Sequence, residues 1–163
     1  MMKSITAKEA GQIIVCIGVC EAAGIIGSIF TASSVATWYQ TLNKPWFNPP
    51  GFVFSAVWIA LYAMMGLSLF LIWRDGQGSP NYRAALATFA AQLLVNVLWS
   101  YAFFGLQSPL AGILVIVLLW LLILQTIVTF WSIRREAALL LIPYILWVSF
   151  AGFLNYTVWR LNP

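Results

Sequence analysis

The chain has 163 residues, of which 63% are hydrophobic, 16% aromatic and only 7% charged. Soluble domains carry about 25% charged residues, and a soluble core of this size cannot hide so much apolar surface. The net charge of +4 comes from eight scattered basic residues, which form no stripe for nucleic acid. The composition therefore excludes a soluble or nucleic-acid-binding domain and predicts an integral, multi-pass membrane protein.

Five apolar segments are long enough to cross a bilayer, for which about 20 mostly apolar residues are needed. They cover approximately residues 11–30, 50–73, 81–104, 109–133 and 137–160. Lipid offers no partners to free backbone groups, so each segment is expected to be a helix. We predict an all-α protein, a single five-helix transmembrane domain over residues 1–163, with a lid loop at 31–49.

The first segment carries a carboxylate, Glu21, at the middle of the span. A carboxylate at this depth is costly and is expected to face protein or water, or to be protonated. Two interpretations stay open: a proton or ligand contact, or an interface carboxyl that is hydrogen-bonded to a neighbouring helix. Gly18, Ala23 and Gly27 form a stripe of small residues, which permits close helix approach.

The later segments have recognisable starts and one expected irregularity. Asn48 is predicted to cap the second helix, with Pro49 and Pro50 in its first turn. Ser108 followed by Pro109 predicts the start of the fourth helix, which is apolar almost all round and suits lipid or an oligomer contact. Inside the fifth segment, Pro143 is expected to kink or loosen the helix.

The basic residues are distributed unequally between the two ends of such a bundle. The N-terminal side would carry Lys3, Lys8, Arg74, Arg83, Arg134 and Arg135, and the other side Lys44 and Arg160. The positive-inside rule then favours a cytoplasmic N-terminus. The rule applies to a bacterial membrane and is weak for an organelle outer membrane, and both locations stay open.

Three predicted helices each present an aromatic and amide-bearing face at helical spacing. These faces consist of Phe54, Trp58 and Tyr62; of Gln92, Asn96, Trp99, Ser100 and Phe103; and of Tyr144, Trp147, Ala151 and Asn155. Buried amides need partners in a bilayer, so they should point into the bundle. By depth, the three faces meet beneath the loop at 38–50, and we predict a cavity with a lid there.

Aromatic walls with a few amides and hydroxyls suit a large, flat, mostly apolar ligand, such as a tetrapyrrole or a sterol. Tryptophan also gathers at membrane interfaces whatever the function, and we assign Trp46, Trp73, Trp131 and Trp159 to such belts. Without histidine the sequence lacks the commonest metal ligand, and we expect neither a metal site nor a resident cofactor.

A short pattern near the C-terminus matches a proposed sterol motif. Leu154, Tyr156 and Arg160 fit the L/V-x-Y-x-K/R spacing, which is a weak pattern that arises often by chance. The alternative is an interfacial Tyr/Trp/Arg anchor at the end of the fifth helix.

Three blocks resemble one known family closely and in the same order. They are WYQTLNKPWFNPP with VFSAVWIALYAMMG, then AAQLLVNVLWSYAFFG, then PYILWVSFAGFLNYTVWRLN. Together they are similar to the TspO/translocator family, also called tryptophan-rich sensory proteins or peripheral benzodiazepine receptors. The resemblance implies a five-helix bundle, often homodimeric, that binds protoporphyrin IX-like porphyrins, cholesterol, and synthetic benzodiazepine or isoquinoline ligands.

The resemblance also implies functional residues. Ligand-site positions carry over to Tyr39, Trp58, Asn96, Trp99, Ser100, Trp147 and Ala151, whereas Glu21 is outside the family pattern. The leading hypothesis is a porphyrin- and lipid-binding sensor, scavenger or transporter. One alternative is light- and oxygen-dependent porphyrin breakdown, with Trp58 and Trp147 as the implied catalytic tryptophans. Another is a purely structural or assembly role.

Overall fold

The structure, a computed structural model, describes residues 6–163, and within them it contains helices and no strand. The helices are α1 (Ala7–Val35), α2 (Trp38–Thr41), α3 (Gly51–Asp75), α4 (Tyr82–Ser100), the π-helical η1 (Tyr101–Gly105), α5 (Pro109–Trp131), α6 (Arg135–Leu139) and α7 (Ile142–Leu161). Five helical stretches in this part of the chain are long and apolar enough to span a membrane: α1, α3, α4 with η1, α5, and α6 with α7. The predicted five-helix membrane fold is confirmed.

The first helix extends beyond the predicted span at both ends. It starts with a capping box, in which Thr6 accepts from the Glu9 amide and the Glu9 carboxylate accepts from the Thr6 amide. It continues to Val35, and hydroxyls of its polar residues find partners within the helix, as the Ser28 hydroxyl donates to the Ile25 carbonyl (2.7 Å). The segment between the first two long helices therefore covers residues 36–50 and is shorter than the predicted lid loop at 31–49.

The predicted cap of the second long helix is wrong. Pro50 occupies the N-cap position of α3 and no side chain caps the helix, because Asn48 is engaged elsewhere. Its side-chain oxygen accepts from the Tyr39 hydroxyl at 2.9 Å. The expected start of the fourth long helix is confirmed, because Ser108 caps α5 by accepting from the Ala111 amide. The irregularity expected near Pro143 is also confirmed, because the last span breaks between α6 and α7, just before this proline.

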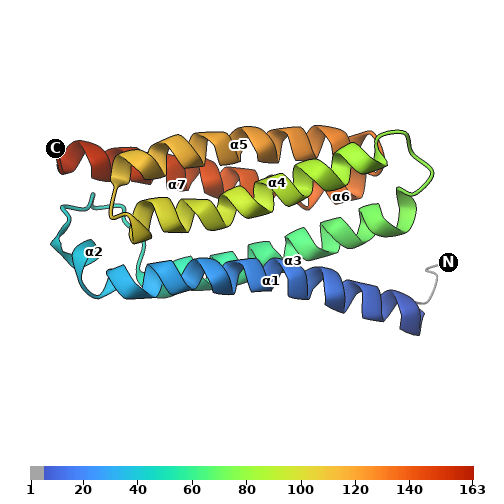
Figure 1. Cartoon of the computed structure of the whole chain (residues 1–163), viewed down its shortest axis with the longest axis horizontal. Helices are drawn as coiled ribbons and strands as arrows, with labels where there is room; N and C mark the ends of the chain where they lie inside the picture. The colour runs from blue at the N-terminus through green and yellow to red at the C-terminus, as the bar shows by residue number, and fades with distance from the viewer. Residues whose placement is uncertain (1–5) are drawn as a thin grey trace.

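The long helices run side by side in one bundle, with the start of α1 at one end and the C-terminus at the other, which is also the end that holds α2 (Figure 1). α1 packs against α3 and α4, α4 packs against α5, and α5 packs against α7. α1 and α3 pack closely at Gly66, where an added Cβ would meet the Ile17 Cα at 2.5 Å.

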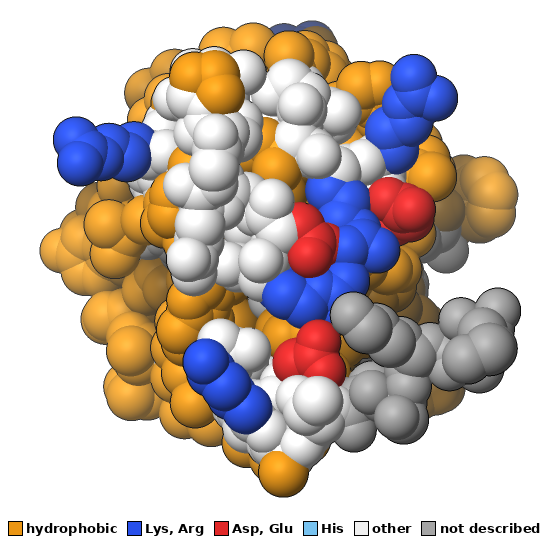
Figure 2. All heavy atoms as spheres, turned by 90° about the vertical axis from the view of Figure 1, so that its right-hand side faces the viewer, with side chains coloured by type: hydrophobic (Ala, Val, Ile, Leu, Met, Phe, Trp, Pro, Cys, Tyr) orange, Lys and Arg blue, Asp and Glu red, His pale blue; other side chains and the backbone are white. Residues whose placement is uncertain are grey.

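An ionic network covers the end of the bundle near the N-terminus. Arg74 lies 3.6 Å from Glu9 and 2.9 Å from Asp75, and Arg134 pairs with Asp75 and with Glu136 (3.4 Å). Figure 2 shows basic and acidic side chains gathered at this end, with apolar side chains around the flanks. The network joins the start of α1 to the end of α3 and to the α5–α6 turn.

Candidate ligand-binding cavity

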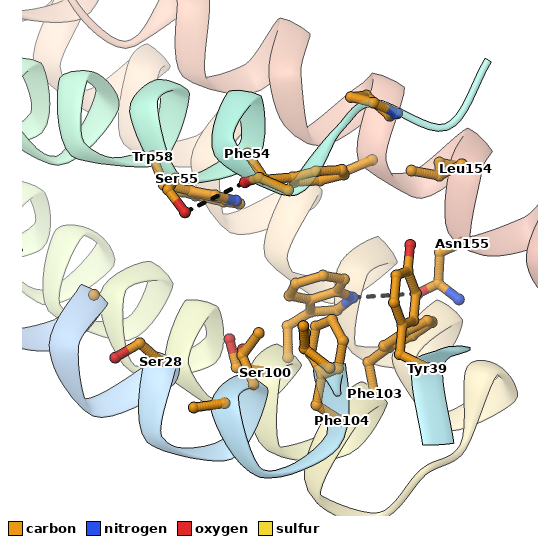
Figure 3. A pocket seen from close by; sticks show the side chains of 18 of the residues that line it. Ser28, Tyr39, Phe54, Ser55, Trp58, Ser100, Phe103, Phe104, Leu154 and Asn155 are labelled. Atoms are coloured by element: carbon orange, nitrogen blue, oxygen red, sulfur yellow. Dashed lines mark hydrogen bonds between the residues drawn. The ribbon is translucent and has the colours of Figure 1, made fainter. Parts of the chain in front are cut away.

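A cavity of about 850 Å³ lies in the half of the bundle that is closed by α2 and the loop after it. Its lining residues come from α1, the 36–50 segment, α3, α4 with η1, and α7. Figure 3 shows Phe54, Ser55 and Trp58 on one side of this space, with Ser100, Phe103, Phe104 and Tyr39 across from them. The volume falls within the range of about 300–1,000 Å³ that is usual for small-molecule sites.

The α3 wall is aromatic because its cavity-facing residues follow four-residue steps. Trp58 stacks on Tyr62 with ring centroids 5.6 Å apart and an interplanar angle of 30°. Phe54 lies one turn closer to the lid and contacts the Trp147 ring edge-on at 5.5 Å. Phe54, Trp58 and Tyr62 together form an aromatic wall of the cavity.

The opposite wall depends on the π-helical turn at the end of α4. The Leu106 amide donates to the Tyr101 carbonyl at 2.8 Å, which widens the helix by one residue. In this wider turn, the neighbours Phe103 and Phe104 are both buried and both border the cavity. Trp99 stacks on Phe103 at 5.6 Å and donates to the Asn155 side-chain oxygen at 3.2 Å. The turn thus adds a second aromatic surface that faces the first.

A buried polar cluster closes the inner end of the cavity. Tyr62 donates to the Asn96 side-chain oxygen at 2.5 Å, and the Asn96 amide group donates to the Tyr144 hydroxyl at 2.9 Å. Tyr144 in turn donates to the Gln92 side-chain oxygen at 3.0 Å. The cluster links α3, α4 and α7 and satisfies the amide of Asn96, which is 3% exposed, as predicted for an amide inside the bundle.

The lid is fixed at several points. The Asn43 amide donates to the Asn162 side-chain oxygen at 2.9 Å, and Asn162 donates back to the Asn43 carbonyl at 3.0 Å. Lys44 donates to the Tyr39 carbonyl at 2.7 Å and lies over the Tyr39 ring. Burial raises the pKa of Tyr39 above its ordinary value, so at neutral pH the phenol stays protonated and can donate to Asn48.

A fourth wall comes from α1, which the sequence prediction of three walls had omitted. Its cavity-facing residues are Glu21, Gly24, Ile25, Ser28, Thr31, Ala32 and Val35. Ile25 on α1 and Ile59 on α3 border the cavity while they are 65% and 61% exposed. The cavity therefore reaches the surface between α1 and α3, within the spanning part of the bundle.

All but one of the residues predicted to line a ligand border this cavity. They are Tyr39, Phe54, Trp58, Tyr62, Asn96, Trp99, Ser100, Phe103 and Ala151. Trp147 does not border it, because the side chain packs behind Phe54 and against Phe150, with ring centroids 5.4 Å apart in the second pair. Its indole nitrogen is buried and has no hydrogen-bond partner in the described chain.

The three residues of the proposed sterol motif do not share one surface. Leu154 is buried and borders the cavity, whereas Tyr156 is 48% exposed and Arg160 is also exposed. Tyr156 contacts the Trp159 ring at 5.9 Å on the outside of α7. Tyr156 and Arg160 thus have the placement of an interfacial anchor, and Leu154 belongs to the cavity wall.

The fold and the cavity define a class: a multi-pass membrane protein of five spans, with an aromatic, lid-covered site in one half of the bundle. The family model of the TspO/MBR family matches residues 16–160. The chain therefore belongs to the TspO/MBR family.

Relatives across the family are similar over most of their length. The chain is 44% identical to the tryptophan-rich protein TspO of Chlorobaculum tepidum, over 96% of this chain and 99% of the relative. It is 38% identical to the tryptophan-rich sensory protein of Cereibacter sphaeroides, over 77% of each chain. It is 32% identical to the translocator protein of Bos taurus, over 85% of this chain and 83% of the relative.

Proposed function

We propose that this protein binds protoporphyrin IX-like tetrapyrroles in the lid-covered cavity, and that sterols or flat synthetic ligands of the benzodiazepine or isoquinoline type use the same space. The observation that carries the proposal is the pair of facing aromatic walls, Trp58 with Tyr62 on α3 and Trp99 with Phe103 on α4 and η1. Two such walls can hold a flat conjugated ring by stacking. The opening between α1 and α3 gives an apolar ligand a route from lipid.

The proposed role is sensing, scavenging or transport of such ligands across or within the membrane. Relatives that carry the names sensory protein and translocator protein support this class of role. Lys44, the one cation among the described lining residues, lies at the lid, where the carboxylates of a bound porphyrin would reach the membrane interface. The ring system would then lie deeper, between the aromatic walls.

Removing one aromatic wall tests the proposal. Trp58→Ala is expected to weaken protoporphyrin IX binding about tenfold, or about 1.4 kcal/mol, because the ring loses its stacking surface on α3. Binding is measured in detergent or nanodiscs by quenching of the remaining tryptophan fluorescence. Trp131→Ala is the matched control, because Trp131 lies at the other end of the bundle and is 46% exposed.

The outcomes of this experiment separate three functions. Unchanged affinity in a folded Trp58→Ala protein contradicts the proposed site, and no saturable binding to the parent protein favours a structural or assembly role.

The same samples, illuminated in air, test porphyrin breakdown with dioxygen as oxidant. Porphyrin breakdown, the second candidate function, is favoured by the indoles of Trp58 and Trp99, which both border the cavity. Trp147 does not border the cavity and would reach a bound ligand only through its contact with the Phe54 ring. New bilin-like absorbance in the parent that is lost in Trp58→Phe would support it.

We further propose a cytoplasmic N-terminus and a homodimer. Within residues 6–163, the N-terminal end holds Lys8, Arg74, Arg83, Arg134 and Arg135, and the opposite end Lys44 and Arg160, which favours a cytoplasmic N-terminal end. A dimer is most simply formed through α5, where Leu114, Val117, Leu121 and Val128 are each more than half exposed. The small-residue stripe of α1 is less suited, because Ala23 and Gly27 are buried inside the bundle.

A further inference from the structure

Glu21 borders the inner end of the cavity, at the central position of the 29-residue helix α1. One turn further along α1, Gly24 lies directly against the Tyr62 ring, so Glu21 is level with the polar cluster rather than with the lid. From Glu21 to Val35, cavity-facing residues recur every three or four positions, which covers about 21 Å of helix. The carboxylate therefore lies far from the lid, at mid-membrane depth.

Within residues 6–163, Glu21 has no hydrogen bond or ion pair to another residue, so the interpretation as an interface carboxyl bonded to a neighbouring helix is wrong for the monomer. Among the described lining residues, the other charged side chain is Lys44, at the opposite end. Its ammonium group is engaged by the carbonyls of Tyr39 and Leu42 at 2.7 and 3.1 Å. Ionisable side chains at mid-membrane depth pair with one another or serve as counter-ions of ligands.

We propose that Glu21 is the counter-ion for a protonated nitrogen on a flat aromatic ligand that occupies the inner end of the cavity. The inference deepens the proposed function and rests on it, because it assigns a ligand class to the same cavity. Trp58 and Tyr62 border the same end, and their ring faces attract a cation at close range. Carboxylate and ring faces together select a cationic aromatic group over a neutral one of the same shape.

The same charge pattern orients a ligand that carries acidic groups. Carboxylates are repelled from Glu21 at the inner end and attracted by Lys44 at the lid. A ligand with an acidic and a basic end would therefore lie lengthwise in the cavity, with its acidic groups at the membrane interface.

A pair of matched probes tests this inference. At neutral pH 9-aminoacridine is a cation, and acridine is a neutral molecule of nearly the same flat shape. Binding of each is measured by fluorescence to the parent protein and to Glu21→Gln in phosphatidylcholine nanodiscs, with empty nanodiscs subtracted. The parent is expected to prefer the cation, and Glu21→Gln to lose about tenfold in affinity for 9-aminoacridine while acridine binding stays unchanged.

Two further variants separate charge from folding. Glu21→Asp keeps the carboxylate and is expected to retain most of the preference, and Ser33→Ala, at an exposed position of the same helix that does not border the cavity, is expected to leave both affinities unchanged. Equal loss of both probes in Glu21→Gln, or an unchanged preference, overturns the inference. Protoporphyrin IX binding measured on the same samples tests the proposed function separately: if it persists while the cation preference is insensitive to Glu21, this inference alone fails.

Discussion

A single side chain, Asn96 of α4, fixes the position of the α3 aromatic wall relative to α4 and α7. It accepts from Tyr62 on α3 and donates to Tyr144 on α7, so one amide links three helices. Such bonds between membrane helices contribute about 0.6–2 kcal/mol, a modest amount because polar groups also find partners before the helices assemble. The wall residue Tyr62 thus owes its position to a neighbour rather than to its own helix alone.

Replacing this amide with an apolar residue of similar size is expected to destabilise the protein. Asn96→Leu should lower the free energy of unfolding by about 1 kcal/mol, because the hydroxyls of Tyr62 and Tyr144 lose a partner. The measurement is denaturant or thermal unfolding in detergent. Leu94→Ala on the same helix, where the side chain is 71% exposed, should change it less, and an equal loss at both positions would contradict the role of Asn96.

Residue spacing predicted the cavity walls well but misplaced Trp147. At 100° per residue, Trp147 points about 40° away from Ala151 around α7. That rotation is enough to direct the indole to the far side of Phe54 while Ala151 faces the cavity. Helical periodicity assigns a side chain to a face of its helix. Packing against the neighbouring helix then determines which side chains on that face, here Ala151 rather than Trp147, border the cavity.

At the scale of helices, apolar runs predicted the spans, because lipid demands helices of nearly fixed length. What the apolar runs could not show is that polar residues after them continue α1. Their hydroxyls are satisfied by carbonyls of the same helix, as the Ser33 hydroxyl donates to the Phe30 carbonyl at 2.8 Å. The missed fourth wall had a readable signal, since Glu21, Gly24, Ser28 and Thr31 follow helical spacing. The π-helical turn had none.

The contact between α1 and α3 depends on the absence of a side chain at one position. Gly66→Ala is expected to lower the free energy of unfolding by about 1–3 kcal/mol, because the new Cβ would meet the Ile17 backbone at 2.5 Å and force the helices apart. Gly18→Ala on α1 is the control: nothing lies within 4 Å of its added Cβ, and alanine favours helix. The free energy of unfolding, measured for both variants, should fall for Gly66→Ala and stay level or rise for Gly18→Ala. Equal effects would contradict the close approach.

In the whole molecule, the two ends of the bundle differ in what holds them together. The end near the N-terminus is joined by ion pairs among Glu9, Arg74, Asp75 and Arg134, whereas the other end is covered by an aromatic lid. The ionic end fixes α1 to α3, whereas toward the lid residues of the same two helices border the cavity. A packed end and a hollow end thus occur in one small bundle.

The ionic network should contribute a modest and salt-dependent stability. Arg134→Ala is expected to cost at most about 1 kcal/mol, because its side chain is 28% exposed and such pairs are screened. The loss, measured by unfolding in low salt, should shrink at 1 M salt. Arg83→Ala is the control, since Arg83 is exposed and has no ion pair within the described chain. A loss that does not respond to salt would contradict an electrostatic role.

A structure of the protein with protoporphyrin IX bound would locate the ligand itself. We expect the macrocycle in the cavity beneath Tyr39, between Trp58 of α3 and Trp99 of α4, with its carboxylates toward Lys44. A macrocycle bound on the lipid-facing side of α5, with the cavity between these two tryptophans left empty, would contradict this expectation.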